Sequence, residues 1–178
     1  MQTYEFELKC SLPTLDADAD EYAHALYAGG CDDALIGTGL AGKIAIRFSR
    51  EADSAMGAIE SAIRDVRRIL PEVRLIESGP DLVGLSEIAE HLGCTRQNVR
   101  KLMINNYTEF PQPFHDGKTQ IWRLAEVLAW LKSSRKSLVA DDCLAEVAHV
   151  NMQCNIVLRD LPNIDAEMCG ELRALVGK

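Results

Sequence analysis

The sequence predicts an α+β fold built from three successive parts. Short strand-like segments alternate with helical segments over residues 1–78. Residues 82–136 combine helices with one short extended interruption, and residues 138–178 are helical and acidic. A Gly-Pro step within residues 78–81 favours a turn, so it is the expected boundary between the first two parts. A chain of 178 residues suits one large domain or two small ones.

The first part follows the order strand, helix, strand, strand, helix, strand. Its opening strand alternates apolar with polar residues from Tyr4 to Cys10. Two short strands on either side of Gly39 and Gly42 have the pattern of a hairpin. A long helix with an apolar stripe follows them and ends at Pro71. This order predicts a split βαβ, or ferredoxin-like, domain.

Charge is distributed unevenly along the chain. The net charge is −8, but residues 1–80 carry −6, residues 81–136 carry +2 and residues 137–178 carry −4. Only the middle part is basic. An acidic protein such as this one can still bind DNA through one local basic face. No apolar run approaches the ~20 residues of a membrane-spanning helix. The first residues lack the pattern of a secretory signal, so we expect a cytoplasmic protein without membrane contact.

Residues 85–104 have the spacing of a helix-turn-helix unit. The small Ala89 lets a second helix approach closely, and Gly93 supplies the conformation of a tight turn. Thr95 can cap the second helix. The candidate DNA-binding side chains of this helix are Thr95, Arg96, Gln97, Asn98, Arg100 and Lys101. Arginine can pair with guanine, and glutamine or asparagine with adenine, so we expect a recognition helix in the major groove, with Lys101 on phosphate.

The following segment predicts a wing. Two prolines keep residues 110–114 extended, a turn follows at Asp116-Gly117, and a strand returns through Trp122 before the next helix. This is a winged-helix layout. Its tip would present four side chains to phosphate or to the minor groove, namely His115, Lys118, Thr119 and Gln120. The alternative for the second helix is an ordinary solvated polar face, but no acidic residue occurs between positions 94 and 107.

Residues 82–131 resemble the excisionase and prophage-regulator branch of winged helix-turn-helix proteins, which is similar to the DNA-binding domain of MerR-type regulators. Residues 85–102 carry the first part of the resemblance. The later positions that carry it are Phe110, Pro111, Pro113, Trp122, Glu126, Val127, Trp130 and Leu131. The resemblance implies a recognition helix around residues 96–101, a wing around residues 115–120, and DNA-binding regulation without catalysis. The first and third parts of the chain lie outside it.

Three other sequence features could form functional sites, but each also has a purely structural interpretation. Asp32-Asp33 could serve metal or acid–base chemistry, although paired acids at a turn are usually turn residues. Residues 37–42 match a GxGxxG dinucleotide fingerprint, but a strand follows them where that fingerprint needs a helix. A basic helix face could extend a phosphate-binding surface or form ion pairs with nearby acids; it consists of Arg64, Arg67 and Arg68.

The cysteines and histidines form no recognisable reactive or metal-binding pattern. None of the six cysteines forms a CxxC pair, and the four histidines are scattered. We therefore expect reduced, mostly buried thiols and no structural zinc site. Without a local signature of a catalytic triad, the sequence predicts no enzymatic activity, no metal and no cofactor.

Together these features predict a sequence-specific transcriptional regulator of bacterial or phage type that binds double-stranded DNA. The helical third part carries an apolar stripe that includes Leu144, Val147 and Ala148, and we expect it to form a homodimer that matches two half-sites. Folding back onto the winged helix is the alternative. The alternative function is an antitoxin-like or adaptor protein, in which acidic residues 1–78 bind a protein partner and DNA binding serves autoregulation.

Overall fold

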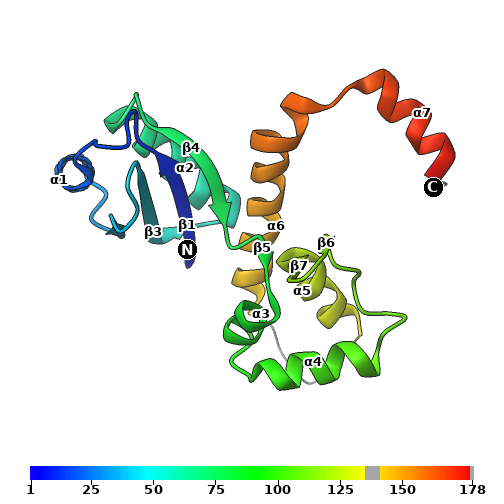
Figure 1. The fold of residues 1–178 in the computed structure, drawn as a ribbon. Coiled ribbons are helices and arrows are strands. Elements are labelled where there is room, and N and C mark those ends of the chain that lie inside the picture. Colours follow the sequence, from blue (N-terminus) through cyan, green and yellow to red (C-terminus); the bar gives the residue numbers. More distant parts are fainter. Residues whose placement is uncertain (135–140, 177–178) are drawn as a thin grey trace.

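The structure is a computed structural model that describes residues 1–134 and 141–176. It is a mixed α+β fold, as the sequence predicts, with a four-stranded sheet and its helices on one side and a mostly helical unit on the other (Figure 1). The expected boundary at residues 136–138 lies outside the described residues. No helix in the described ranges has both the length and the apolar character needed to cross a membrane.

The first domain has the element order indicated by the sequence. Its elements are β1 (Gln2–Ser11), α1 (Ala19–Ala28), β2 (Ala34–Gly37), β3 (Lys43–Ala52), α2 (Ala55–Ile69) and β4 (Arg74–Gly79). The four strands are antiparallel and lie in the spatial order β2-β3-β1-β4. The expected hairpin connects β2 to β3, and Gly42 adopts a φ of +67° within it.

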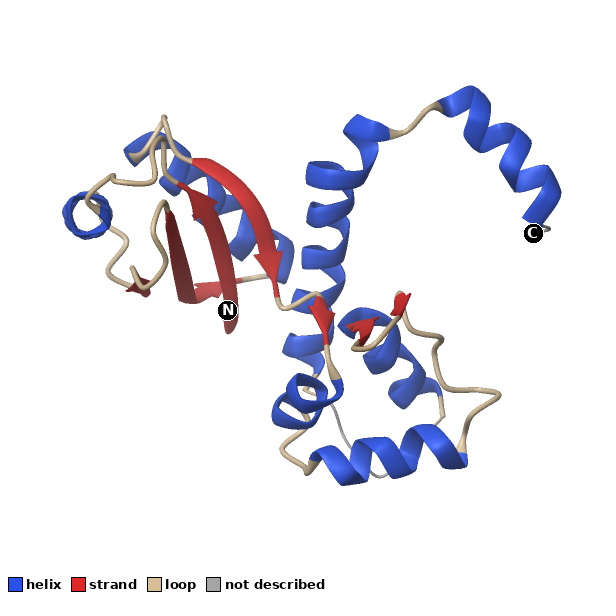
Figure 2. Ribbon diagram, in the orientation of Figure 1, coloured by secondary structure: helices blue, strands red, loops and turns tan. Residues whose placement is uncertain are grey.

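One face of this sheet is apolar and is covered by helices, whereas the other is charged. Inward-pointing side chains of β1 alternate with polar ones, and Phe6 stacks on Phe48 of β3 with ring centroids 5.3 Å apart. The helix α2 begins where the Ser54 hydroxyl accepts a hydrogen bond from the Gly57 N–H at 3.1 Å. Its buried stripe packs on the apolar face of the sheet (Figure 2). Glu7 and Lys9 of β1 therefore lie on the opposite face.

The second domain contains the expected helices and hairpin. Its elements are β5 (Leu82–Val83), α3 (Leu85–His91), α4 (Arg96–Asn105), β6 (His115–Asp116), β7 (Gln120–Arg123) and α5 (Leu124–Ser133). The strand β5 is an addition to the predicted layout; it pairs with β7 and makes a small sheet of order β5-β7-β6. A separate apolar core holds this domain together, with Trp122, Leu128 and Val99 fully buried.

The helix α6 (Asp142–Asn155) lies between the two domains (Figure 1). Val147 belongs to the core of the first domain and Ala148 to that of the second, while Leu144 packs against the second. The prediction that this stripe pairs with a second chain is wrong, because the same chain already covers it. The alternative, folding back onto the winged helix, describes one side of α6, because the other side packs against the first domain and α6 thereby joins the two.

The chain beyond α6 leads away from the body of the protein (Figure 1). It forms one π-helical turn, η1 (Ile156–Asp160), a short 3-10 turn, η2 (Leu161–Asn163), and the helix α7 (Ala166–Val176). The two helices of the expected C-terminal pair are therefore present, but α6 packs on the two domains and not on α7.

A buried polar network fixes α6 to the junction between the domains. Asp81 accepts hydrogen bonds from Arg123 Nη1 at 2.9 and 3.1 Å, and from Asn155 Nδ2 at 2.8 Å. The side-chain oxygen of Asn155 accepts from the Ser78 N–H at 2.9 Å, and the Ser78 hydroxyl donates to Asn151 at 2.6 Å. These bonds connect the end of β4, the start of α5 and two turns of α6, so the network holds the two domains in one mutual orientation.

Candidate nucleic-acid interface

The turn between α3 and α4 is built by local hydrogen bonds and one glycine. Gly93 has a φ of +61°, a conformation that side chains other than glycine disfavour. The Cys94 N–H donates to the Ala89 carbonyl at 2.9 Å and closes the end of α3. The Thr95 hydroxyl accepts from the Asn98 N–H at 3.2 Å, which caps α4 as the sequence predicts. Thr95 therefore shapes the start of the helix.

The outer face of α4 is cationic and exposed. Arg96, Gln97, Arg100 and Lys101 are all exposed, whereas Val99 on the opposite face is fully buried. Across the described ranges, none of these four side chains forms a hydrogen bond or an ion pair. Asn98 is also exposed, toward one side of this face. The helix therefore presents hydrogen-bond donors to solvent with no carboxylate to neutralise them.

The hairpin β6–β7 lines the same groove as Arg96, the first residue of α4. His115, Lys118 and Thr119 are exposed on it, as expected for a wing tip. Gln120 is half-buried, and its Nε2 donates to Asp116 Oδ1 at 2.8 Å across the hairpin. Gln120 thus stabilises the hairpin and is less free to meet a ligand than the sequence suggests.

A groove of about 510 Å³ lies between the start of α3 and this hairpin, and Arg96 of α4 also lines it. It brings together Arg96 with Lys118, Thr119 and Gln120, which are distant in the sequence. The remaining candidates lie outside its lining; they are Thr95, Gln97, Asn98, Arg100, Lys101 and His115. The candidate residues therefore fall into two groups. One group lines the groove, and the other lies on α4 and at the edge of the hairpin outside it.

The aromatic and proline positions that carry the resemblance have packing roles. Phe110 is buried and makes edge-to-face contacts with Trp122 and Trp130, with ring centroids 6.4 and 5.0 Å apart. The Trp122 indole donates to the Pro111 carbonyl at 3.1 Å. The guanidinium of Arg123 lies 4.7 Å from the centroid of the Phe114 ring. These contacts hold the extended segment against the domain, and so they set where the hairpin stands.

One acid of the Asp32-Asp33 pair, Asp33, has a structural partner. Arg50 donates to both carboxylate oxygens of Asp33, at 2.7 and 3.1 Å, and to Asp65 at 2.9 Å. Burial alone would lower the pKa of Arg50, but its two carboxylate partners raise it above its ordinary value, so the guanidinium stays protonated. Two positions of the basic face on α2 are also paired. Arg64 binds Glu60 at 2.6 Å, and Arg68 binds Asp65 at 3.2 Å.

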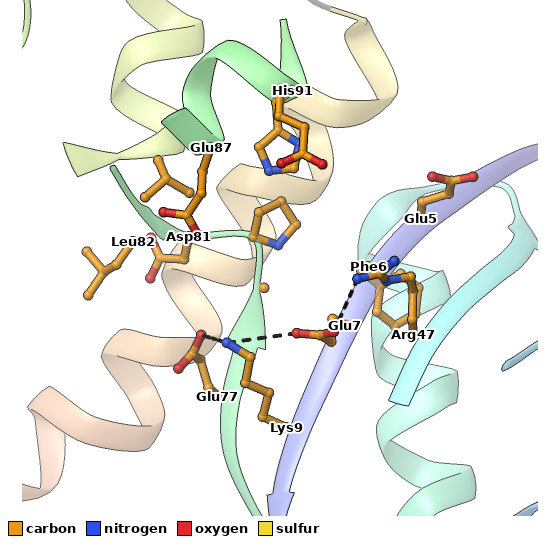
Figure 3. Close-up of a pocket in the computed structure, with 14 residues that line it drawn as sticks. Glu5, Phe6, Glu7, Lys9, Arg47, Glu77, Asp81, Leu82, Glu87 and His91 are labelled. Carbon is orange, nitrogen blue, oxygen red and sulfur yellow. Dashed lines mark hydrogen bonds and ion pairs between the residues drawn. The ribbon is translucent and has the colours of Figure 1, made fainter. Parts of the chain in front are cut away.

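An acidic groove between the two domains has no counterpart in the sequence analysis. Its volume is about 400 Å³, and most of its charged lining is acidic (Figure 3). The charged lining residues are Glu5, Glu7, Lys9, Arg47, Glu77, Asp81, Glu87 and Glu90. Lys9 binds Glu77 at 2.8 Å inside it. Burial alone would lower the pKa of Lys9, but Glu77 raises it above its ordinary value. In the sequence, only the alternation of apolar and polar residues in β1 indicated that Glu5 and Glu7 share one face of the sheet.

The thiols and histidines bring no further chemistry together. Cys10 and Cys31 are buried, and burial raises the pKa of the Cys10 thiol to about 12. A thiol with that pKa is not a nucleophile near neutral pH. Over residues 1–134 and 141–176, no group of three or more metal-ligating side chains converges on one point.

Comparisons with known protein families, with curated proteins and with solved structures find no match to this chain.

Proposed function

We propose that this protein is a sequence-specific DNA-binding transcriptional regulator without enzymatic activity. In this proposal, α3, α4 and the hairpin β6–β7 form a winged helix-turn-helix of the excisionase and prophage-regulator type, and the first domain is ferredoxin-like. The observation that carries the proposal is the outer face of α4. A chain of net charge −8 exposes three cationic side chains and one amide there, without acidic partners among the described residues.

The proposed mechanism is occupancy of a DNA site. The side chains of Gln97, Arg100 and Arg96 contact base edges in the major groove, and Lys101 and Lys118 contact phosphates. The acidic first domain repels DNA, which keeps non-specific binding low and confines attraction to one face.

A dimer is part of this proposal, because a single helix-turn-helix unit buries too little surface for high affinity. Since α6 is covered within the chain, we assign the dimer contact to a C-terminal apolar strip. This strip consists of the exposed residues Val157, Leu161, Ile164, Met168 and Leu172, which recur every three or four positions. A second copy would cover this strip, and the dimer would then carry two copies of α4, as binding to two half-sites requires.

Selection from a random pool of DNA duplexes tests the function. The full chain is mixed with the pool at physiological salt, and bound duplexes are recovered and sequenced over several rounds. We expect a defined motif to be enriched. A matched variant, Gln97→Ala with Arg100→Ala, should lose that enrichment. Recovery of random sequence by the wild-type protein would contradict sequence-specific binding.

A second candidate is an antitoxin-like or adaptor protein whose first domain binds a basic protein partner. The acidic groove between the domains favours it, because five glutamates line that groove. A stoichiometric protein recovered with the full chain from a lysate, and lost in the variant Glu5→Lys with Glu90→Lys, would support this function.

A further inference from the structure

Ile104 is an exposed apolar residue on a helix whose other large apolar side chains are covered. It lies in the last turn of α4, and 58% of its surface is accessible to solvent. Its neighbours Leu102 and Met103 pack against the core of the second domain, and Val99 is part of that core. Single exposed apolar residues are common on protein surfaces, so the position of Ile104 matters more than its exposure alone.

That position is on the outer face of α4, near its C-terminal end. Ile104 follows Gln97 by seven residues, Arg100 by four and Lys101 by three, and residues at these spacings share one side of a helix. The buried Val99 and the half-buried Leu102 and Met103 define the opposite side. A branched apolar side chain therefore lies on the same side of the helix as the side chains that the proposed function places in the major groove, about one turn beyond Arg100.

The major groove offers one apolar group to a protein, and that group is the methyl of thymine. The other base edges present hydrogen-bond donors and acceptors, which isoleucine cannot satisfy. A helix rises about 1.5 Å per residue, so Ile104 lies about 6 Å beyond Arg100 along the axis. This distance is roughly two base steps at about 3.4 Å per base.

We propose that Ile104 contacts the methyl group of a thymine, roughly two base steps from the base that Arg100 contacts. The inference rests on the proposed function and adds a specificity determinant to it. The branched side chain suits this role, because a β-branched residue in a helix has one strongly preferred rotamer and holds its methyl groups in place. A thymine at that step is then preferred over cytosine or uracil, which lack the methyl group.

The test is a thermodynamic cycle on the duplex enriched by the full-length protein. Each thymine of the motif is replaced in turn by deoxyuridine, which removes the methyl and leaves the base pairing intact. Affinities are measured by fluorescence anisotropy for the wild-type protein, for Ile104→Ala, and for Leu40→Ala as a matched control. Leu40 is an exposed leucine in the hairpin between β2 and β3, far from α4.

We expect one thymine at which deoxyuridine weakens wild-type binding about fourfold, the effect of about one methyl group removed from an apolar contact. Ile104→Ala should weaken binding to the thymine duplex similarly, and deoxyuridine should then cause no further loss. Leu40→Ala should behave as wild type. Thermal melting of the free proteins checks that the exposed substitutions leave the fold intact.

Equal deoxyuridine effects in the wild-type protein and in Ile104→Ala, or no sensitive thymine, would overturn the inference while the enriched motif keeps the proposed function. Failure of the wild-type protein to enrich any motif would overturn both. If Ile104→Ala leaves DNA affinity unchanged and instead abolishes a stoichiometric protein complex, Ile104 is a protein contact and the inference is also overturned.

Discussion

Arg96 and Arg100 differ from Arg50, Arg64 and Arg123 in their surroundings. The latter three bind carboxylates of the same chain, so their charges stabilise the fold. Arg96 and Arg100 have no such partner in the part of the chain that the structure describes. An unpaired guanidinium on a rigid helix can form a bidentate contact with guanine without first breaking an ion pair, so it is suited to base recognition.

Substitution of these two arginines should therefore reduce specific binding. We expect Arg96→Ala and Arg100→Ala each to weaken binding to the enriched duplex by about 1–3 kcal/mol, with a smaller effect on a scrambled duplex. Anisotropy titrations measure both affinities. Arg64→Ala is the matched control, because it removes the same charge from an exposed helix face of the first domain. Equal losses in Arg64→Ala and Arg100→Ala would mean that the effect is only one of net charge.

Lys118 at the tip of the hairpin should act through phosphate. We expect Lys118→Ala to weaken binding to all sequences alike and to reduce the slope of log affinity against log salt by about one unit. Lys132→Ala serves as a control, because Lys132 is already paired with Asp142 at 2.9 Å. A changed sequence preference with an unchanged salt slope would show that Lys118 contacts bases, or that the hairpin is not a wing.

Local sequence patterns predicted the helices and strands, but they did not predict how distant elements pack against each other. The turn at Gly93 and the strand alternation of β1 depend on neighbouring residues, so the sequence predicted both. The stripe on α6 showed that one face is buried but not what buries it, and the sequence interpretation chose the wrong partner. Asn151 and Asn155 continue that stripe and are buried. Polar residues within an apolar stripe were the one sign in the sequence of a buried hydrogen-bond network.

The buried polar network at the junction should contribute strongly to the stability of the fold. Asp81 is 2% exposed and Arg123 is 7% exposed, so removing one partner leaves a buried charge poorly compensated. We expect Asp81→Ala to lower the free energy of unfolding by about 3–5 kcal/mol, measured by urea denaturation. Glu60→Ala removes one partner of an exposed ion pair and should cost at most about 1 kcal/mol. An unchanged urea midpoint in Asp81→Ala would contradict the structural role of the network.

At the scale of the whole molecule, α6 joins two domains of opposite charge. The acidic first domain and the basic face of α4 are held in one orientation, so under the proposed function only one side of the protein would be attracted to DNA. The sequence predicted this segregation of charge, because it depends on composition alone. The mutual placement of the domains depends on contacts between residues more than 70 positions apart, such as Asn155 and Asp81, for which no local pattern exists.

The proposed dimer also concerns the whole molecule. We expect the full chain to be a dimer through the C-terminal apolar strip, and the variant Leu161→Asp with Met168→Asp to be a folded monomer, because each buried charge would lack a partner. Light scattering coupled to gel filtration measures the mass. Leu40→Asp, at an exposed leucine of the first domain, should remain dimeric. Wild-type protein that runs as a monomer at high micromolar concentration would contradict the dimer.

We propose that the outer face of α4 and the hairpin β6–β7 contact DNA. Backbone amide signals of the ¹⁵N-labelled full chain, recorded by NMR as the enriched duplex is added, test it residue by residue. We expect the largest changes in amide chemical shift over residues 95–105 and 115–120, and no change in α1 and α2. Shifts confined to the charged face of the first sheet, or no shifts with any duplex, would contradict it.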